Sequence, residues 1–108
     1  MAYKVSLTPL AFGQLESCYL YILYEFNDVF AAQAFDKDAE KTIARLATMA
    51  ESQPVCEDPL LRKMGYRVIH FEKHRYKIVY LIVGDTVEIH GIYHNLQNLE
   101  KQIRLRLD

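Results

Sequence analysis

A histidine and two cations in the last third of the chain have the residue types and spacing for phosphate chemistry. Arg75 and Lys77 begin one apolar run, and His94 ends the next. RNA cleavage requires a group that takes the 2′-hydroxyl proton, cations that stabilise the pentacovalent phosphate and an acid for the leaving oxygen. Arg75, Lys77 and His94 are therefore our candidate catalytic residues.

Simpler interpretations of these residues stay open. His94 could be a strand-end residue that hydrogen-bonds the following turn, and the two cations could lie on an ordinary solvated strand face. A metal site that includes Glu88, His90 and His94 is not expected, because four strand residues separate the two histidines by roughly 13 Å. We expect no metal and no cofactor.

Elements that could position these side chains follow from the periodicity of the sequence. Tyr3–Leu7 alternates as a half-buried strand does, and Thr8-Pro9 suits the cap and first position of a helix. That helix runs to about Phe26, and Asn27-Asp28 can cap a second helix that ends at Ser52-Gln53-Pro54. The short connection predicts an antiparallel helical hairpin.

The second half of the chain is predicted to form strands. Residues 54–63 read as an irregular connection, and residues 96–107 have the spacing of a short helix. Three runs rich in Val, Ile, Tyr and Phe predict an antiparallel meander: Tyr66–Phe71, Tyr76–Val83 and Thr86–His94. The expected fold is α+β in the order β-α-α-β-β-β-α, one domain over 1–108 in which an antiparallel twisted sheet packs against the hairpin.

The turn between the last two strands fixes which side chains share a face. A two-residue type II′ turn at Gly84-Asp85 would place Lys77 opposite Ile92 and Arg75 opposite His94. The three candidate catalytic residues would then lie on one open, partly basic face, and the helices would cover the other.

Charge is distributed unevenly along the chain. Residues 1–61 contain four Lys/Arg and nine Asp/Glu, whereas residues 62–108 contain nine and five. Arg62, Lys63 and Arg67 are candidate phosphate-binding residues in the basic part. A three-residue loop after the first strand of the meander would place Arg67 on the basic face, and a two-residue turn would place it on the apolar one.

Composition excludes several classes of protein. The 108 residues have a net charge of −1, which argues against a protein that coats nucleic acid indiscriminately. No apolar run approaches the ~20 residues of a membrane span, and no signal peptide is recognisable, so we expect a cytoplasmic protein without membrane contact. Cys18 and Cys56 have no metal-ligand or disulfide spacing and are expected to be reduced thiols.

Three phrases of the sequence, in their order and spacing, resemble the RelE/ParE superfamily of bacterial toxins. They are Gly65–Val68, His74–Tyr80 and Asp85–His94, and the resemblance extends from Tyr3 to about Asn98. It implies the toxin of a type II toxin–antitoxin or plasmid stabilisation system, with a cognate antitoxin as partner. One branch resembles ribosome-dependent mRNA endonucleases, and another resembles poisons of DNA gyrase that cleave nothing.

The resemblance leaves the target open. Lys77 stands where the nuclease branch often has arginine, and Asn95–Asn98 lacks the arginine that many members place after the last strand. Tyr21 and Tyr24 are expected to contact the antitoxin. The expected assembly is a homodimer of the chain, or a heterotetramer of the chain with the antitoxin. The alternative is a non-toxic interaction module with this fold.

Overall fold

The computed structural model describes residues 2–107, except for the side chains of residues 100, 104, 106 and 107. Its elements follow the predicted order, with one additional short helix and one 3₁₀ turn. They are β1 (Lys4–Leu7), α1 (Pro9–Phe26), α2 (Val29–Met49), η1 (Ala50–Ser52), α3 (Pro59–Met64), β2 (Arg67–His70), β3 (Tyr76–Val83), β4 (Thr86–His94) and α4 (Leu99–Leu107).

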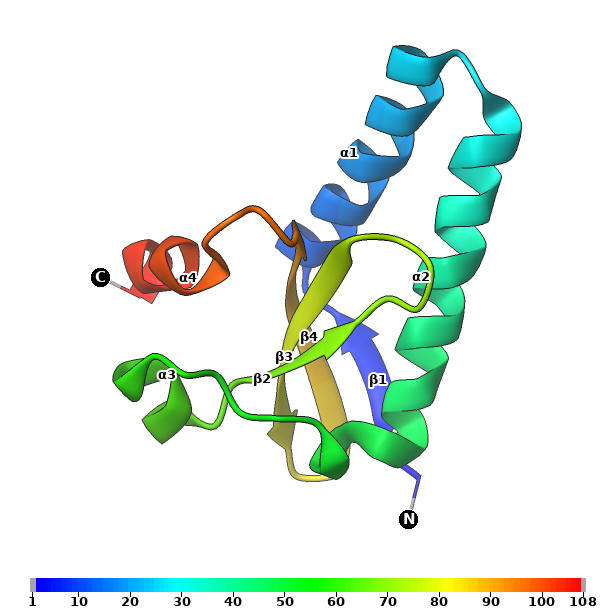
Figure 1. The fold of residues 1–108 in the computed structure, drawn as a ribbon. Coiled ribbons are helices and arrows are strands. Elements are labelled where there is room, and N and C mark those ends of the chain that lie inside the picture. Colours follow the sequence, from blue (N-terminus) through cyan, green and yellow to red (C-terminus); the bar gives the residue numbers. More distant parts are fainter. Residues whose placement is uncertain (1, 108) are drawn as a thin grey trace.

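The four strands form one sheet in the order β1-β4-β3-β2 (Figure 1). β1 joins the sheet beside the meander and pairs in parallel with β4. The sheet is therefore mixed, and the expectation of a purely antiparallel sheet is wrong for this one pair. The α+β class and the element order are confirmed.

Side-chain caps explain why the hairpin helices begin where the sequence predicts. The Thr8 hydroxyl accepts a hydrogen bond from the Ala11 N–H, and the Asp28 carboxylate accepts from the N–H groups of Phe30 and Ala31. Asn27 ends α1 in a left-handed conformation, with φ 47°. Asn27 and Asp28 thus set the two ends of the hairpin turn, and Thr8 sets the start of α1.

The connection expected to be irregular contains α3. The Asp58 carboxylate caps this helix by accepting from the N–H groups of Leu60 and Leu61, and Pro59 occupies its first turn. Gly65 ends it with φ 90°. Asp58-Pro59 is thus the same start signal as Thr8-Pro9, and the sequence prediction missed it.

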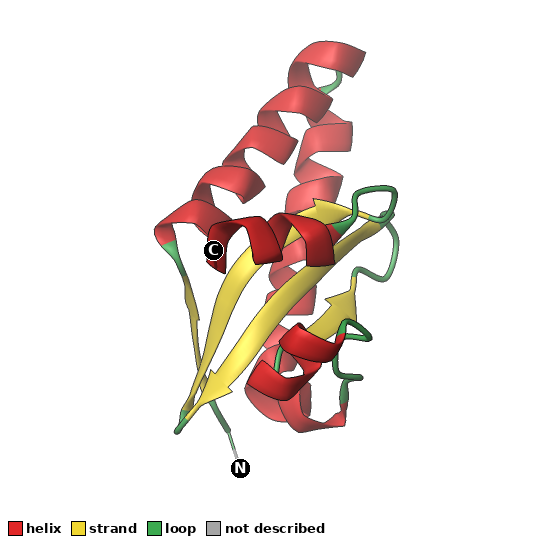
Figure 2. Cartoon of the chain, turned by 90° about the vertical axis from the view of Figure 1, so that its left-hand side faces the viewer, coloured by secondary structure: helices red, strands yellow, loops and turns green. Residues whose placement is uncertain are grey.

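Helices cover both faces of the sheet. α1 and α2 pack on one face, whereas α3 and α4 lie on the other (Figure 2). On the second face Leu61 of α3 and Leu99 and Ile103 of α4 bury Val79 and Tyr93. The open basic face expected there is therefore wrong, because a second small core covers the middle of it.

A β-bulge in β4 changes the predicted pairing. Val83 pairs with Thr86 and Leu81 with Glu88, as expected, but the register shifts between Val79 and Tyr80. The extra residue is His90, and from Gly91 onward each β4 side chain points to the opposite face from the one predicted.

The shifted register overturns two predicted pairs at the end of the hairpin. Lys77 lies opposite Tyr93 rather than Ile92, and His94 lies opposite Tyr76 rather than Arg75. Ile92 turns toward α1 and α2, where its N–H donates to the Gln14 side chain at 2.9 Å.

Candidate functional site

The bulge places the candidate catalytic residues on different faces of the sheet. The His94 ring packs edge-on against Tyr76, with centroids 5.1 Å apart, on the face of the helical hairpin. Lys77 is paired with Tyr93, whose side chain belongs to the core under α3 and α4. Arg75 and His94 line one hollow and Lys77 lines another, so the three side chains do not converge.

His94 makes the hydrogen bonds to the following turn that its simpler interpretation predicts. Its Nδ1 accepts a hydrogen bond from the Leu96 N–H at 3.1 Å, and its backbone N–H donates to the Gln97 side chain at 2.8 Å. A neutral ring that accepts at Nδ1 carries its proton on Nε2. In this state Nε2 can donate a hydrogen bond but cannot act as a general base.

The candidate phosphate-binding residues are also divided between the faces. Arg62 and Lys63 are exposed in the last turn of α3, where cations favour the helix C-terminus. Arg67 pairs with Tyr80 on the hairpin face and donates to the Gln53 carbonyl at 2.6 Å. The loop 72–75 has four residues, an even number like that of a two-residue turn. It therefore places Arg67 on the apolar face, as a two-residue turn would.

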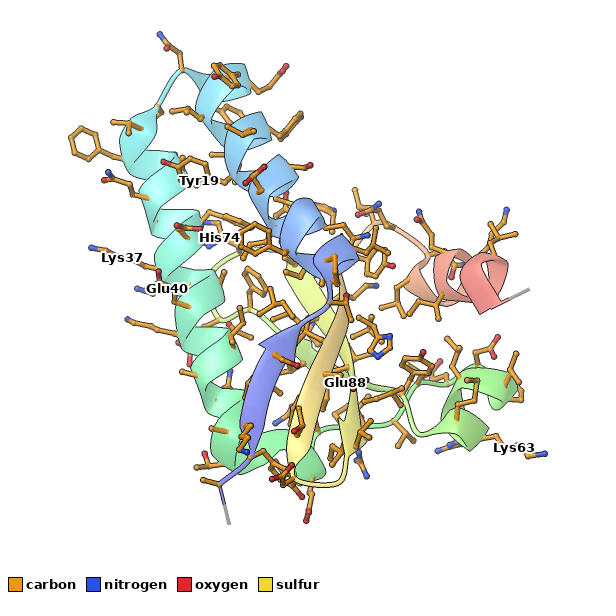
Figure 3. All side chains as sticks on the ribbon, turned by 180° about the vertical axis from the view of Figure 1, so that it is seen from behind. Tyr19, Lys37, Glu40, Lys63, His74 and Glu88 are labelled. Atoms are coloured by element: carbon orange, nitrogen blue, oxygen red, sulfur yellow. The ribbon has the colours of Figure 1, made fainter. Side chains whose placement is uncertain are left out.

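The loop 72–75 is fixed to the hairpin by a carboxylate that the sequence reasoning missed. Asp38, a buried residue of α2, accepts hydrogen bonds from the N–H groups of Lys73 and His74, both at 2.9 Å, and of Glu72 at 3.3 Å. Its Oδ2 also lies 2.7 Å from His74 Nδ1. Figure 3 shows His74 beside α2. An acidic residue at a core position of a predicted helix was the available signal.

These contacts decide the ionisation of Asp38. Burial raises the pKa of a carboxyl group, but here the hydrogen bonds from the His74 ring and from the three backbone N–H groups outweigh burial. The net effect lowers the pKa of Asp38 below its ordinary value of 3.8. The carboxylate is therefore charged at neutral pH and holds the loop against α2.

The turn end of the hairpin extends beyond the sheet (Figure 1). Its large apolar side chains are exposed. Tyr21 is 57% exposed and Tyr24 76% exposed, and Phe26 and Phe30 are exposed to 64% and 78%. Contiguous apolar surface of this kind is typical of sites of protein–protein contact. Tyr21 and Phe26 stack edge to face, with centroids 6.5 Å apart.

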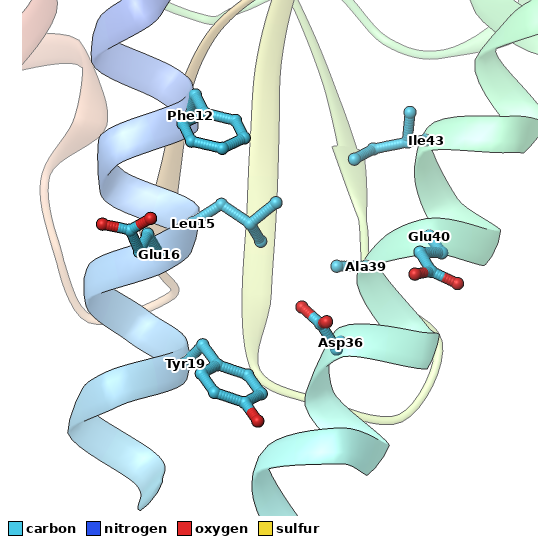
Figure 4. A pocket seen from close by; sticks show the side chains of 8 residues that line it. All are labelled: Phe12, Leu15, Glu16, Tyr19, Asp36, Ala39, Glu40 and Ile43. Atoms are coloured by element: carbon cyan, nitrogen blue, oxygen red, sulfur yellow. The ribbon is translucent and has the colours of Figure 1, made fainter.

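A third hollow lies between α1 and α2 (Figure 4). Its volume is about 320 Å³, and its apolar lining includes Phe12, Leu15 and Ile43. Glu16, Asp36 and Glu40 contribute carboxylates to the same lining.

Other polar groups give no sign of metal binding. His90 Nε2 lies 3.2 Å from a carboxylate oxygen of Glu88, and its ring packs edge-on against Tyr66. Among the described residues, no three His, Cys, Asp or Glu side chains are grouped closely enough to hold an ion. Within the same residues, no helix has the length and apolar composition of a membrane span. Cys18 and Cys56 form no disulfide.

Comparison with known proteins identifies a toxin family. The sequence matches the family described as "ParE toxin of type II toxin-antitoxin system, parDE" over residues 5–99. A solved structure, "Chromosomal ParDE TA system from P. aeruginosa", is similar to this chain with a TM-score of 0.70 and 18% identity. The similarity covers 86% of this chain and 96% of that one. No curated protein matches.

The structural similarity supports the fold, and the sequence match covers β1 through the start of α4. Together they agree with the resemblance found in the sequence. The chain belongs to the ParE toxin family of type II toxin–antitoxin systems.

Proposed function

We propose that this chain inhibits DNA gyrase by binding, without cleaving RNA, and that a cognate antitoxin suppresses this activity. The observation that carries the proposal is the position of Lys77 and His94 on opposite faces of the sheet. A ribonuclease needs its base, acid and cations around one phosphate. Without such a group, family membership favours the branch that resembles gyrase poisons.

The hydrogen bonding of His94 supports the same conclusion. Its Nδ1 is occupied by the Leu96 N–H, so the neutral ring has no free lone pair to accept a 2′-hydroxyl proton. The net charge of −1 also gives the chain little general attraction for the ribosome or its RNA.

The exposed apolar residues of the hairpin turn are the proposed antitoxin contact. Tyr21 and Tyr24 expose more than half of their side chains to solvent. Tyrosine combines a large apolar ring with a hydroxyl, which suits a protein interface that must also be stable in water.

One observation favours mRNA cleavage as the second candidate. Arg75 and His94 line the same hollow, so a cation and a hydrogen-bond donor face one space. This arrangement could stabilise a phosphate by charge and by hydrogen bonding, although the neutral ring supplies no base.

Two assays on the purified chain separate these candidates. We expect it to block supercoiling by gyrase and to leave transcripts on translating ribosomes intact. Cleaved transcripts with normal supercoiling would reject the gyrase proposal and favour the nuclease.

Variants of the candidate catalytic residues test the same point in cells. We expect Lys77→Ala combined with His94→Ala to inhibit growth as strongly as the unmodified chain when induced without antitoxin. Lys37→Ala, an exposed lysine on α2, is the control for expression level and folding. Loss of toxicity in the double variant alone, with its circular dichroism unchanged, would support catalysis.

A further inference from the structure

The hollow beside the hairpin turn joins two surfaces that the sequence analysis treated separately. Its volume is about 710 Å³. Tyr21, a predicted antitoxin contact, lines it together with Arg75 and His94, two predicted catalytic residues. A ligand in this hollow would therefore touch both sets.

The two walls of the hollow differ in chemistry. Helices α1 and α2 supply an apolar wall that includes Tyr21, Ile22 and Phe26. The loop 72–75 supplies Lys73 and Arg75, which are exposed and form no ion pair with any of the described carboxylates.

Nearby acids do not neutralise this cationic wall. Asp28 also lines the hollow, but its carboxylate caps α2. Asp38 is directed at the backbone of the loop and at the His74 ring. Lys73 and Arg75 are thus available to an external anion.

The loop that carries these cations is already ordered. Three backbone N–H bonds and the His74 contact join it to Asp38, and the Arg75 carbonyl accepts from the Asn95 N–H at 2.9 Å. Fixing a binding loop before the ligand arrives lowers the entropic cost of association.

We infer that this hollow binds an acidic and apolar segment of the antitoxin. The apolar side chain of that segment packs on Tyr21 and Phe26, and its carboxylate pairs with Lys73 and Arg75. The inference rests on the proposed antitoxin partner and adds the chemistry of the segment that fits here.

A protein segment fits this hollow better than a nucleic acid does. The lining contains aliphatic groups such as Ile22 and Ala34, which have no role in contacting phosphates. Among the described residues, two lysine or arginine side chains line it, whereas phosphate backbones are bound by longer rows of cations. The hairpin itself lies in the acidic half of the chain.

The test uses the complex of this chain with the protein encoded by the adjacent gene. Lys73→Gln with Arg75→Gln should weaken the complex roughly 5- to 30-fold, because two partly exposed ion pairs are lost. When the salt concentration is raised, the complex of this double variant should also lose less affinity than the complex of the unmodified chain. Arg62→Gln with Lys63→Gln, which removes two cations from the opposite face, should leave both quantities unchanged.

The competing outcomes are separable. Unchanged affinity and salt dependence in Lys73→Gln with Arg75→Gln would overturn the inference. So would a loss of binding to a single-stranded RNA or duplex DNA oligonucleotide without a loss of antitoxin binding, which would assign the hollow to nucleic acid. Gyrase inhibition is measured on the chain alone, so failure there would reject the proposed target and leave this inference intact.

Discussion

The carboxylate of Asp38 lies 2.7 Å from Nδ1 of His74 and so connects the second helix of the hairpin to the loop between β2 and β3. The two residues are 36 positions apart in the sequence. Only 2% of the Asp38 side chain is exposed, compared with 28% of the His74 side chain. The hairpin therefore sets the position of Lys73 and Arg75 through a single buried group.

Removal of that carboxylate should destabilise the fold. Asp38→Ala leaves three backbone N–H groups and the His74 ring without their acceptor, at a cost of about 2–4 kcal/mol in the free energy of unfolding. Urea titration followed by circular dichroism measures this change. Asp36→Ala on the same helix is the control and should change stability by less than about 0.5 kcal/mol. Equal effects of the two variants would contradict the assigned role of Asp38.

Stability should decrease at acid pH through the same residue. The pKa of Asp38 is lower in the folded chain than in the unfolded one, so its contribution is fully present above the ordinary carboxyl value of about 4. It is lost as the pH falls through the lower folded pKa. The free energy of unfolding should fall more steeply below about pH 4 in the unmodified chain than in Asp38→Ala. Parallel curves would show that other carboxylates control acid unfolding.

Stability should also decrease at alkaline pH, through Tyr80. Its hydroxyl donates to the Ala50 carbonyl at 2.7 Å in the core, and burial raises the pKa of Tyr80 to about 12. Because the folded pKa is the higher one, the stabilisation is complete below the ordinary value of 10 and is lost as the pH rises toward 12.

Absorbance of tyrosinate should report this titration directly. Tyr80→Phe should remove the last step of the titration. An unchanged final step in Tyr80→Phe would assign that step to another tyrosine. The same substitution leaves the buried Ala50 carbonyl without its donor and should cost about 1–3 kcal/mol.

Two glycine substitutions should have opposite effects. A Cβ on Gly91 would lie 2.8 Å from Cζ of Tyr93, whose ring is fixed in the core under α3 and α4. Gly91→Ala should therefore reduce stability by about 1–3 kcal/mol. Gly13 lies within α1 with nothing within 4 Å of the added carbon, so Gly13→Ala should increase stability by about 0.5–1 kcal/mol. Thermal unfolding of both variants checks the contrast, and stabilisation by Gly91→Ala would contradict the packing described.

Elements with local signals could be predicted from the sequence. Thr8 and Asp28 cap their helices through contacts within three residues, so their effect is visible in any short window. The turn at Gly84 was predicted for the same reason. Gly84 has a φ of 62° and the next residue, Asp85, has no positive φ, which agrees with type II′ geometry.

The placement of the candidate site could not be predicted by alternation alone. One extra residue at His90 reverses every later side chain of β4, including His94, and the apolar pattern on either side of the bulge reads equally well in both registers. Gly91, a glycine inside a strand, was the only local sign of the bulge. The Asp38 contacts were harder to foresee, since they join residues that the sequence separates by more than thirty positions.

The pairing of β1 with β4 has a consequence for the newly made chain. Val5 lies beside Val87, so the first strand emerges from the ribosome long before its neighbour has been translated. Until then the two long helices have no complete sheet to cover their apolar sides. The complete sheet can consequently form only after the last of its strands has been translated.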